Sequence, residues 1–211
     1  MRKWYPAIVA LAVVIFTAAV YGRIPEHVPV HWGLDGDVDR YGSRAEGALL
    51  MPFLMLGTWA LMKVLPTIDP RRENYTKFAG TYELFVNAVL TTLALMHVAL
   101  VGAALGWPIS IARVVPALVG TLFVILGNAL PRARPNWWFG IRTPWTLTNE
   151  RVWTRTHRVA GYLLAASGAV LVLVALVPGR WPIALAIGSV IVASLSSIVY
   201  SFIAWKQETG K

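Results

Sequence analysis

The chain has 211 residues, of which 57% are apolar and only 14% are charged, and its mean hydropathy is well above zero. In soluble domains about a quarter of all residues are charged. This composition therefore excludes an ordinary soluble domain and predicts a single polytopic membrane domain. The lack of cysteine excludes disulfides and thiolate chemistry, and the net charge of +9 does not indicate direct nucleic-acid binding, because the cations flank apolar segments.

Six apolar blocks follow one another along the chain, at residues 4–21, 47–65, 81–105, 109–130, 159–177 and 182–205. Each is close to the ~20 residues that a helix needs to cross ~30 Å of hydrocarbon. The sequence therefore predicts an all-α integral membrane protein, a six-transmembrane helix bundle. Its long connections are a structured outer loop at 22–46 and an amphipathic cytoplasmic loop at 131–158. The connection at 66–78 is short and polar, and we interpret it as a plain link.

The distribution of lysine and arginine gives the orientation. With the amino end inside, 14 cations lie on the cytoplasmic side: Arg2, Lys3, Lys63, Arg71, Arg72, Lys77, Arg132, Arg134, Arg142, Arg151, Arg155, Arg158, Lys206 and Lys211. Five lie outside: Arg23, Arg40, Arg44, Arg113 and Arg180. This asymmetry follows the positive-inside rule and predicts a cytoplasmic membrane protein with both termini in the cytoplasm.

The outer loop is rich in acids, glycine and proline and is predicted to be compact and turn-rich. The candidate metal ligands in it are His31, Asp35, Asp37, Asp39 and Glu46. The aspartates alternate and the glutamate is twelfth from the first of them, as in a calcium loop, but Arg40 occupies the sixth position, which requires glycine. The histidine with these acids is an alternative set for a transition metal. The simpler interpretation is that the acids cap turns and pair with Arg40 and Arg44, so we assign no metal and no cofactor.

The stretch 135–161 is long, aromatic and cationic for a connection between membrane helices. Thr143 followed by Pro144 predicts one helix start, and Asn149 followed by Glu150 predicts a second. Arg151 is the first of three arginines, with Arg155 and Arg158, that recur at i, i+4 and i+7 and so share one helix face. Val152, Trp153, Thr156 and Ala160 occupy much of the other face, and His157 neighbours Trp153 one turn away. The simplest interpretation is a juxtamembrane amphipathic helix, with tryptophan at headgroup depth and arginine on lipid phosphate.

Few polar residues interrupt the apolar blocks. Asn87 and His97 are ten residues apart on the third block, close to three turns, and so are roughly co-facial. Hydrogen bonding between helices is the simpler interpretation, and a path for ions or protons past Glu83, Asn87, His97 and Asn128 is the alternative. No nucleophile or carboxylate partner accompanies His157 in the sequence, so we expect no enzyme activity.

Two motifs resemble known families. The segment Gly140-x-Arg142-Thr143-Pro144-Trp145-Thr146-Leu147-x-Asn149-x2-Val152-Trp153-x2-Thr156-His157-Arg158-x2-Gly161 resembles the carboxy-terminal hallmark of the SdpI-like immunity family. The segment Pro29-x-His31-Trp32-x3-Gly36-x2-Asp39-x-Tyr41-Gly42-Ser43-Arg44 resembles an amino-terminal module of uncharacterised function. Gly33 and Arg44 stand where that module usually has asparagine and lysine.

The resemblance implies a bacterial membrane immunity protein that gives resistance to a secreted, membrane-active toxin peptide. It also implies a signalling role in which a cytoplasmic repressor is recruited to the membrane. We expect the toxin to contact the outer loop at Pro29, His31, Trp32, Gly36, Asp39 and Tyr41. We expect the repressor or anionic lipid to contact Arg142, Thr143, Pro144, Trp145, Thr146, Asn149, Val152, Trp153, His157 and Arg158. A membrane enzyme with a His/Asp metal site in the outer loop and a small transporter remain the alternatives.

Overall fold

Six long helices dominate the computed structural model, which describes residues 4–33, 37–177 and 181–210, with backbone only at 181–183. They are α1 (Tyr5–Val20), α2 (Arg44–Ile68), α4 (Ala79–Ala104), α5 (Ile111–Ala129), α7 (Glu150–Val174) and α8 (Trp181–Thr209). All six are long and apolar enough to cross a membrane, so the predicted helix bundle is confirmed. The short elements are η1 (Tyr21–Arg23), β1 (His27–Trp32), β2 (Val38–Ser43), α3 (Asn74–Lys77), η2 (Leu130–Arg132) and α6 (Pro144–Thr148).

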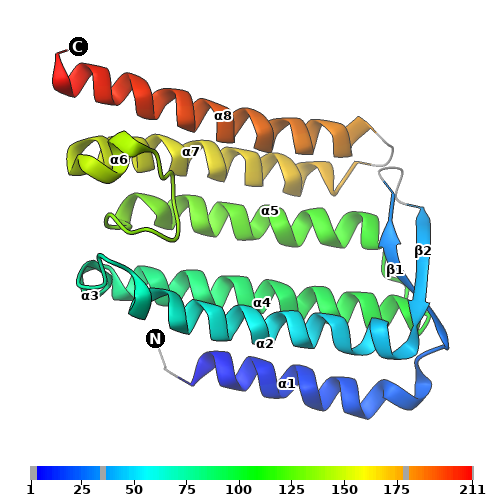
Figure 1. Ribbon diagram of the computed structural model, residues 1–211. Helices are drawn as coiled ribbons and strands as arrows, with labels where there is room; N and C mark the ends of the chain where they lie inside the picture. The colour runs from blue at the N-terminus through cyan, green and yellow to red at the C-terminus, as the bar shows by residue number, and fades with distance from the viewer. Residues whose placement is uncertain (1–3, 34–36, 178–180, 211) are drawn as a thin grey trace.

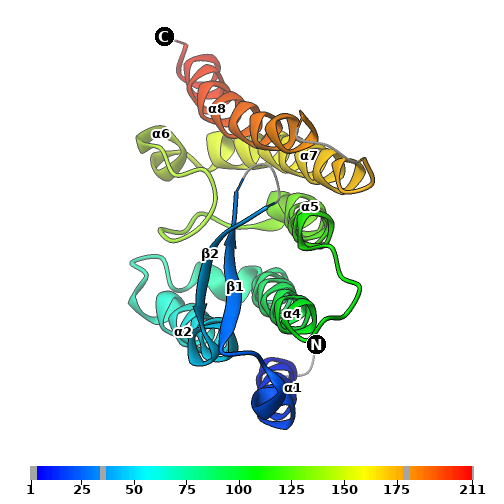
Figure 2. The same ribbon diagram turned by 90° about the vertical axis from the view of Figure 1, so that its right-hand side faces the viewer.

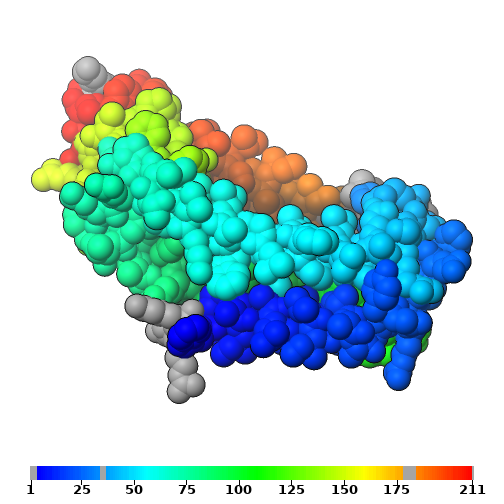
Figure 3. Space-filling view, turned by 60° about the horizontal axis from the view of Figure 1, so that its bottom comes forward, coloured from blue at the N-terminus to red at the C-terminus, as the bar shows by residue number. Residues whose placement is uncertain are grey.

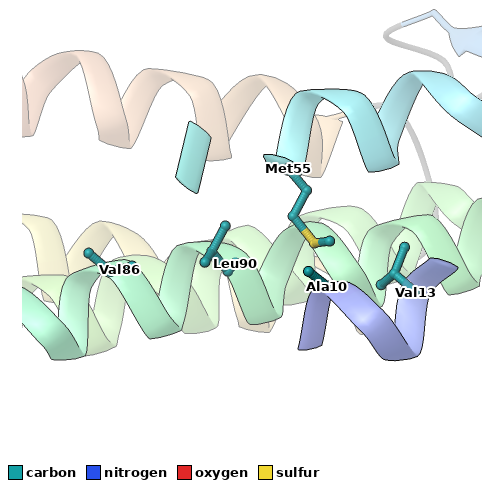
Figure 4. Close-up of a cluster of buried hydrophobic side chains, with 5 residues drawn as sticks. All are labelled: Ala10, Val13, Met55, Val86 and Leu90. Atoms are coloured by element: carbon teal, nitrogen blue, oxygen red, sulfur yellow. The ribbon is translucent and has the colours of Figure 1, made fainter. Parts of the chain in front are cut away.

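The helices form two groups, α1–α2–α4 and α5–α7–α8, which are joined where α4 packs on α5 (Figure 1). In the first group α1 and α2 lie side by side along one face (Figure 3). Ala10 and Val13 of α1, Met55 of α2, and Val86 and Leu90 of α4 meet in a buried cluster there (Figure 4). Because lipid tails are as apolar as these side chains, close packing rather than a hydrophobic driving force holds such helices together.

Two pairs of glycines bring α5 and α7 into close backbone contact. A Cβ atom built on Gly127 would lie 2.6 Å from the carbonyl oxygen of Gly161, and one built on Gly161 would lie 2.6 Å from that of Gly127. Gly120 and Gly168 oppose each other in the same way, two turns further along both helices. Small residues at such crossings let membrane helices approach closely, and α5–α7 is the most extensive helix contact in the fold.

The two long connections lie at opposite ends of the bundle (Figure 1). The antiparallel hairpin β1–β2 marks one end, which we call the hairpin end. Val28 of β1 and Ile24 just before this strand pack against Ala48 and Val101. The segments 66–78 and 131–149 lie at the other end together with the described ends of the chain, and we call this the termini end.

One boundary differs from the prediction. Helix α7 runs without a break from Glu150, whereas residues up to 158 had been placed in a loop. Asn149 caps the helix, and nothing in the following sequence interrupts the helical hydrogen bonds. Pro116 lies inside α5. It is the sixth residue of that helix, so its missing N–H removes one helical hydrogen bond.

Candidate functional site

The hairpin presents several of the predicted residues on an exposed surface. Pro29 pairs with Tyr41 and Trp32 with Val38 across the strands, with irregular register around His31. Tyr41 is 61% exposed. The Nδ1 atom of His31 lies 2.6 Å from Oδ1 of Asp39, and both side chains are exposed. An apolar ligand arriving at this end would therefore meet aromatic rings beside a polar pair.

Glu46 of this loop is used in the fold. Glu46 accepts a hydrogen bond from the guanidinium of Arg40 at 2.8 Å, and its backbone N–H donates to Ser43, which caps α2. Among the residues that the structure describes, no three histidine or acidic side chains lie close enough to hold a metal ion. Asp35, a candidate metal ligand, and Gly36, an expected toxin contact, lie outside the described residues.

At the termini end, capping interactions shape the segment 135–149. The hydroxyl of Thr143 accepts from the N–H of Thr146, whose own hydroxyl accepts from the N–H of Thr143. Asn149 accepts from the N–H groups of Arg151 and Val152 and starts α7. Both predicted helix starts are therefore present. The threonines, Pro144 and Asn149 of the motif supply the turn geometry.

Trp153 and His157 hold this segment against α7. Their rings stack with centroids 3.9 Å apart, and both side chains are almost completely buried. The Nδ1–H group of His157 donates to the carbonyl of Trp153 at 2.8 Å, while Nε2 accepts from the N–H of Ile141 at 3.1 Å. The imidazole is thus neutral, with its proton on Nδ1. Gly140 has a φ of +100°, and a Cβ there would overlap Nε2 of His157, so the motif glycine makes room for the histidine.

The same segment is anchored to α8. The indole N–H of Trp145 donates to the hydroxyl of Ser201 at 2.7 Å. Arg151 pairs with Glu208 at 2.9 Å, and Arg155 donates to the side-chain carbonyl of Gln207. Two of the three co-facial arginines therefore face the last helix rather than lipid phosphate.

The connection at 66–78 is not a plain link, and that prediction was wrong. Asp69 is only 2% exposed. Its carboxylate accepts from the N–H of Arg71 at 2.7 Å, the phenol of Tyr75 at 3.0 Å and the N–H of Trp137 at 2.9 Å. Asn74 donates to the carbonyl of Pro135 at 2.8 Å. No pattern in the sequence indicates this role, because Asp69 follows an apolar helix as any polar residue at a helix end does. Its partner Trp137 lies 68 residues further along the chain.

Two further contacts complete this junction. The guanidinium of Arg71 donates to the carbonyl of Leu147. Asn136 is fully buried, and its side-chain oxygen accepts from the N–H groups of Trp138 and Phe139, each at 2.9 Å. The ring of Phe139 then packs edge-on against Phe85, with centroids 5.0 Å apart. The junction holds the motif segment against the first group of helices.

Burial divides the predicted residues of the termini end into two sets. Thr146, Val152, Trp153 and His157 are at most 1% exposed, so in this structure they position the segment and do not reach a partner. Trp145, Thr143 and Asn149 are partly buried. The exposed predicted residues are Arg142, Pro144 and Arg158. The exposed Trp137 and Trp138 join them, so the accessible surface is aromatic and cationic.

The polar residues within the membrane helices mainly bond other helices or their own backbone. The hydroxyl of Thr17 donates to the carbonyl of Val13, so Nε2–H of His97 donates to the Thr17 oxygen at 2.8 Å. Tyr5 and Thr91 join α1 to α4 in the same way, at 2.7 Å. A pocket of about 370 Å³ lies beside Glu83 and Asn87. Of the four residues considered for a path, His97 bonds another helix, and Asn128 donates to the carbonyl of Val124 in its own helix at 2.8 Å.

Comparisons with known proteins give a match in the amino-terminal part of the sequence and another in the carboxy-terminal part. Residues 132–201 match the model of the SdpI/YfhL protein family, and residues 8–56 match a domain of unknown function (DUF1648). The chain is 24% identical to the Immunity protein SdpI of Bacillus subtilis (strain 168) over 211 residues, which are 100% of this chain and 99% of that protein. No solved structure matches. The predicted resemblance to the SdpI family is confirmed.

Proposed function

We propose that this chain, whose carboxy-terminal region carries the SdpI/YfhL match, is a membrane immunity protein that gives resistance to a secreted, membrane-active toxin peptide. The observation that carries the proposal is the similarity, over the whole length of this chain, to the Immunity protein SdpI of Bacillus subtilis. It extends over all six helices, the hairpin and the motif segment, rather than over one shared helix. We further propose that the protein acts by binding and not by catalysis.

We place the protein in the cytoplasmic membrane with the termini end inside. This orientation rests on the distribution of cations, fourteen on one side against five on the other, and on the position of the two long connections at opposite ends. The hairpin then faces the side from which a secreted peptide arrives. The surface of Trp137, Trp138 and Arg142 faces the cytoplasm.

The two ends suit two different partners. The exposed Tyr41 and the half-buried Trp32 on the hairpin can contact apolar side chains of a toxin peptide. At the termini end, the exposed Arg142 and Arg158 suit an acidic protein surface, such as that of a cytoplasmic repressor, or anionic lipid. Toxin binding could alter the inner surface only if the bundle has two conformations with different affinity for the toxin.

Survival of a toxin-sensitive strain that expresses the protein is the primary test. We expect the wild type to protect, and Tyr41→Ala and Trp32→Ala to reduce protection at unchanged membrane levels. Arg142→Gln and Arg158→Gln should leave protection intact and reduce recruitment of a cytoplasmic partner. A wild-type protein that reaches the membrane at normal levels and gives no protection would overturn the proposal for this chain.

Sidedness is tested separately by cysteine labelling, which is direct here because the chain has no native cysteine. Tyr41→Cys and Thr148→Cys place single thiols at exposed positions on opposite ends. An impermeant maleimide added to intact cells should label the first variant, and the second only after permeabilisation. Equal labelling of both in intact cells contradicts the proposed orientation.

A further inference from the structure

Between the two groups of helices lies an apolar groove of about 380 Å³, which we call the interlayer groove. Its walls include Leu65 of α2, Phe85 and Val89 of α4, Leu126 of α5 and Leu164 of α7. Viewed along the helices, α2 faces α5 and α7 across this space, with the segment 131–143 at its far end (Figure 2). Residues 138–141 of that segment also line the groove.

We propose that the interlayer groove holds one acyl chain of an anionic phospholipid, whose phosphate lies against Arg142. This site is separate from the toxin surface on the hairpin and does not depend on the immunity function. Three observations carry the proposal: the size of the groove, the chemistry of its walls, and the cation and tryptophan beside it.

The size excludes a helical peptide as the occupant. An α-helix with its side chains is about 10 Å wide, so a volume of 380 Å³ would hold only about one turn of it. The walls exclude an extended peptide, because its N–H and C=O groups would find few partners among leucine, valine and phenylalanine. An unbranched hydrocarbon chain has neither the bulk of a helix nor polar groups to satisfy. It therefore fits both constraints.

The chemistry beside the groove selects the headgroup. Trp138 lines the groove and is still 38% exposed, which is the position of a tryptophan at headgroup depth. The guanidinium of Arg142 donates to the carbonyl of Trp137 at 2.7 Å, which holds it next to the groove-lining residues 138–141. The side chain is exposed and has further N–H donors, which suit a phosphate. A lipid with net negative charge is therefore preferred over a zwitterionic one.

Photo-crosslinking of the full-length protein tests the proposal directly. The protein is reconstituted with phosphatidylglycerol that carries a diazirine in the acyl chain, washed with excess unlabelled detergent, and then illuminated. We expect adducts on peptides that contain Val89 and Leu126. Lipid-facing positions such as Leu54 and Leu195, which are 51% and 58% exposed, should give few adducts, because the wash removes the lipid there before illumination. Equal labelling at both kinds of position would overturn the proposal.

Variants separate the groove from the general lipid surface. Leu126→Trp fills the groove and should abolish the retained adduct, whereas Leu61→Trp, an exposed position on α2 outside the groove lining, should not. If Leu126→Trp fails to fold, Val89→Phe provides a smaller filling substitution for the same measurement. Retention of the adduct in folded variants with a filled groove contradicts the proposal, as does recovery of a tightly bound peptide in place of lipid.

The headgroup is tested by competition between phosphatidylglycerol and phosphatidylcholine in native mass spectrometry. One cation near a membrane surface contributes about 1 kcal/mol to binding of anionic lipid, so Arg142→Gln should lower the preference about fivefold. Arg72→Gln is the matched control, because it removes an exposed arginine at the same end that does not line the groove. Equal binding of the two lipids to the wild type would overturn the assignment of an anionic headgroup.

Discussion

The carboxylate of Asp69 accepts a hydrogen bond from the backbone N–H of Trp137, 2.9 Å away, and so joins two connections that are 68 residues apart in the chain. Tyr75 and Arg71 donate to the same carboxylate. Asp69 is thus the centre of the junction that holds the family motif against the first group of helices.

Replacement of Asp69 should loosen this junction. Asp69→Ala leaves the N–H groups of Trp137 and Arg71 and the phenol of Tyr75 without their acceptor, which costs about 1–3 kcal/mol for a buried group that loses its partner. We expect a lower midpoint of thermal unfolding in detergent and faster proteolysis within residues 131–143. Glu73→Ala, on the exposed side of the same connection, is the control and should change neither. Unchanged proteolysis in Asp69→Ala would show that other contacts hold the segment.

Tyr75 makes the stability of the junction depend on pH. Burial, and then its hydrogen bond to Asp69, raise the pKa of Tyr75 well above the ordinary value of 10. The unfolded chain releases this proton near pH 10 and the folded chain retains it. The stabilisation is therefore complete below pH 10 and is lost as the pH rises further. Tyr75→Phe should remove part of the decline in the free energy of unfolding above pH 10, whereas Tyr41→Phe, which replaces an exposed tyrosine, should not.

The contact between Gly127 and Gly161 leaves no space for a methyl group. Gly127→Ala should force α5 and α7 apart and destabilise the protein by about 1–3 kcal/mol, the usual cost of overpacking. Gly57→Ala is the matched control, because a Cβ at Gly57 in α2 would meet nothing within 4 Å. The two variants are compared by thermal unfolding in the same detergent. Equal midpoints would mean that the helices can separate at little cost.

Gly106 is favoured by its positive φ alone, whereas Gly140 is favoured by its positive φ and by the lack of space for a side chain. Both have positive φ, +83° and +100°, but a Cβ at Gly106 meets nothing within 4 Å, whereas one at Gly140 overlaps Nε2 of His157. Gly106→Ala should therefore cost about 1 kcal/mol from backbone strain alone, and Gly140→Ala should cost more. In a His157→Ala background the extra cost at Gly140 should disappear, which a double-mutant cycle measures. Additive effects would contradict a direct clash.

The pair of His31 and Asp39 is a surface feature, with side chains that are 65% and 51% exposed. Exposed pairs contribute about 0–1 kcal/mol, so Asp39→Ala should leave the free energy of unfolding almost unchanged. A loss of toxin protection in this variant would then report a lost contact with the toxin rather than a folding defect. A large fall in stability would show instead that the pair maintains the hairpin.

The sequence by itself determined the six membrane helices and the helix starts at Thr143 and Asn149. It also determined the neighbouring positions of Trp153 and His157. Each of these features depends on local patterns: apolar runs of membrane length, capping residues, and side chains one helical turn apart. The resemblance to the SdpI family was also available from the motif at 140–161, because its residues are contiguous.

Only the tertiary structure decided which motif residues are accessible. The motif predicted both His157 and Arg142 as residues that contact a partner. In the structure Ile141 and Trp153 enclose the histidine, while the arginine lies exposed beside Trp137. The role of Asp69, the opposed glycines of α5 and α7, and the interlayer groove likewise depend on residues distant in sequence. Local propensity fixes where helices form, but which partners meet depends on how the helices pack, and no short stretch of sequence records that.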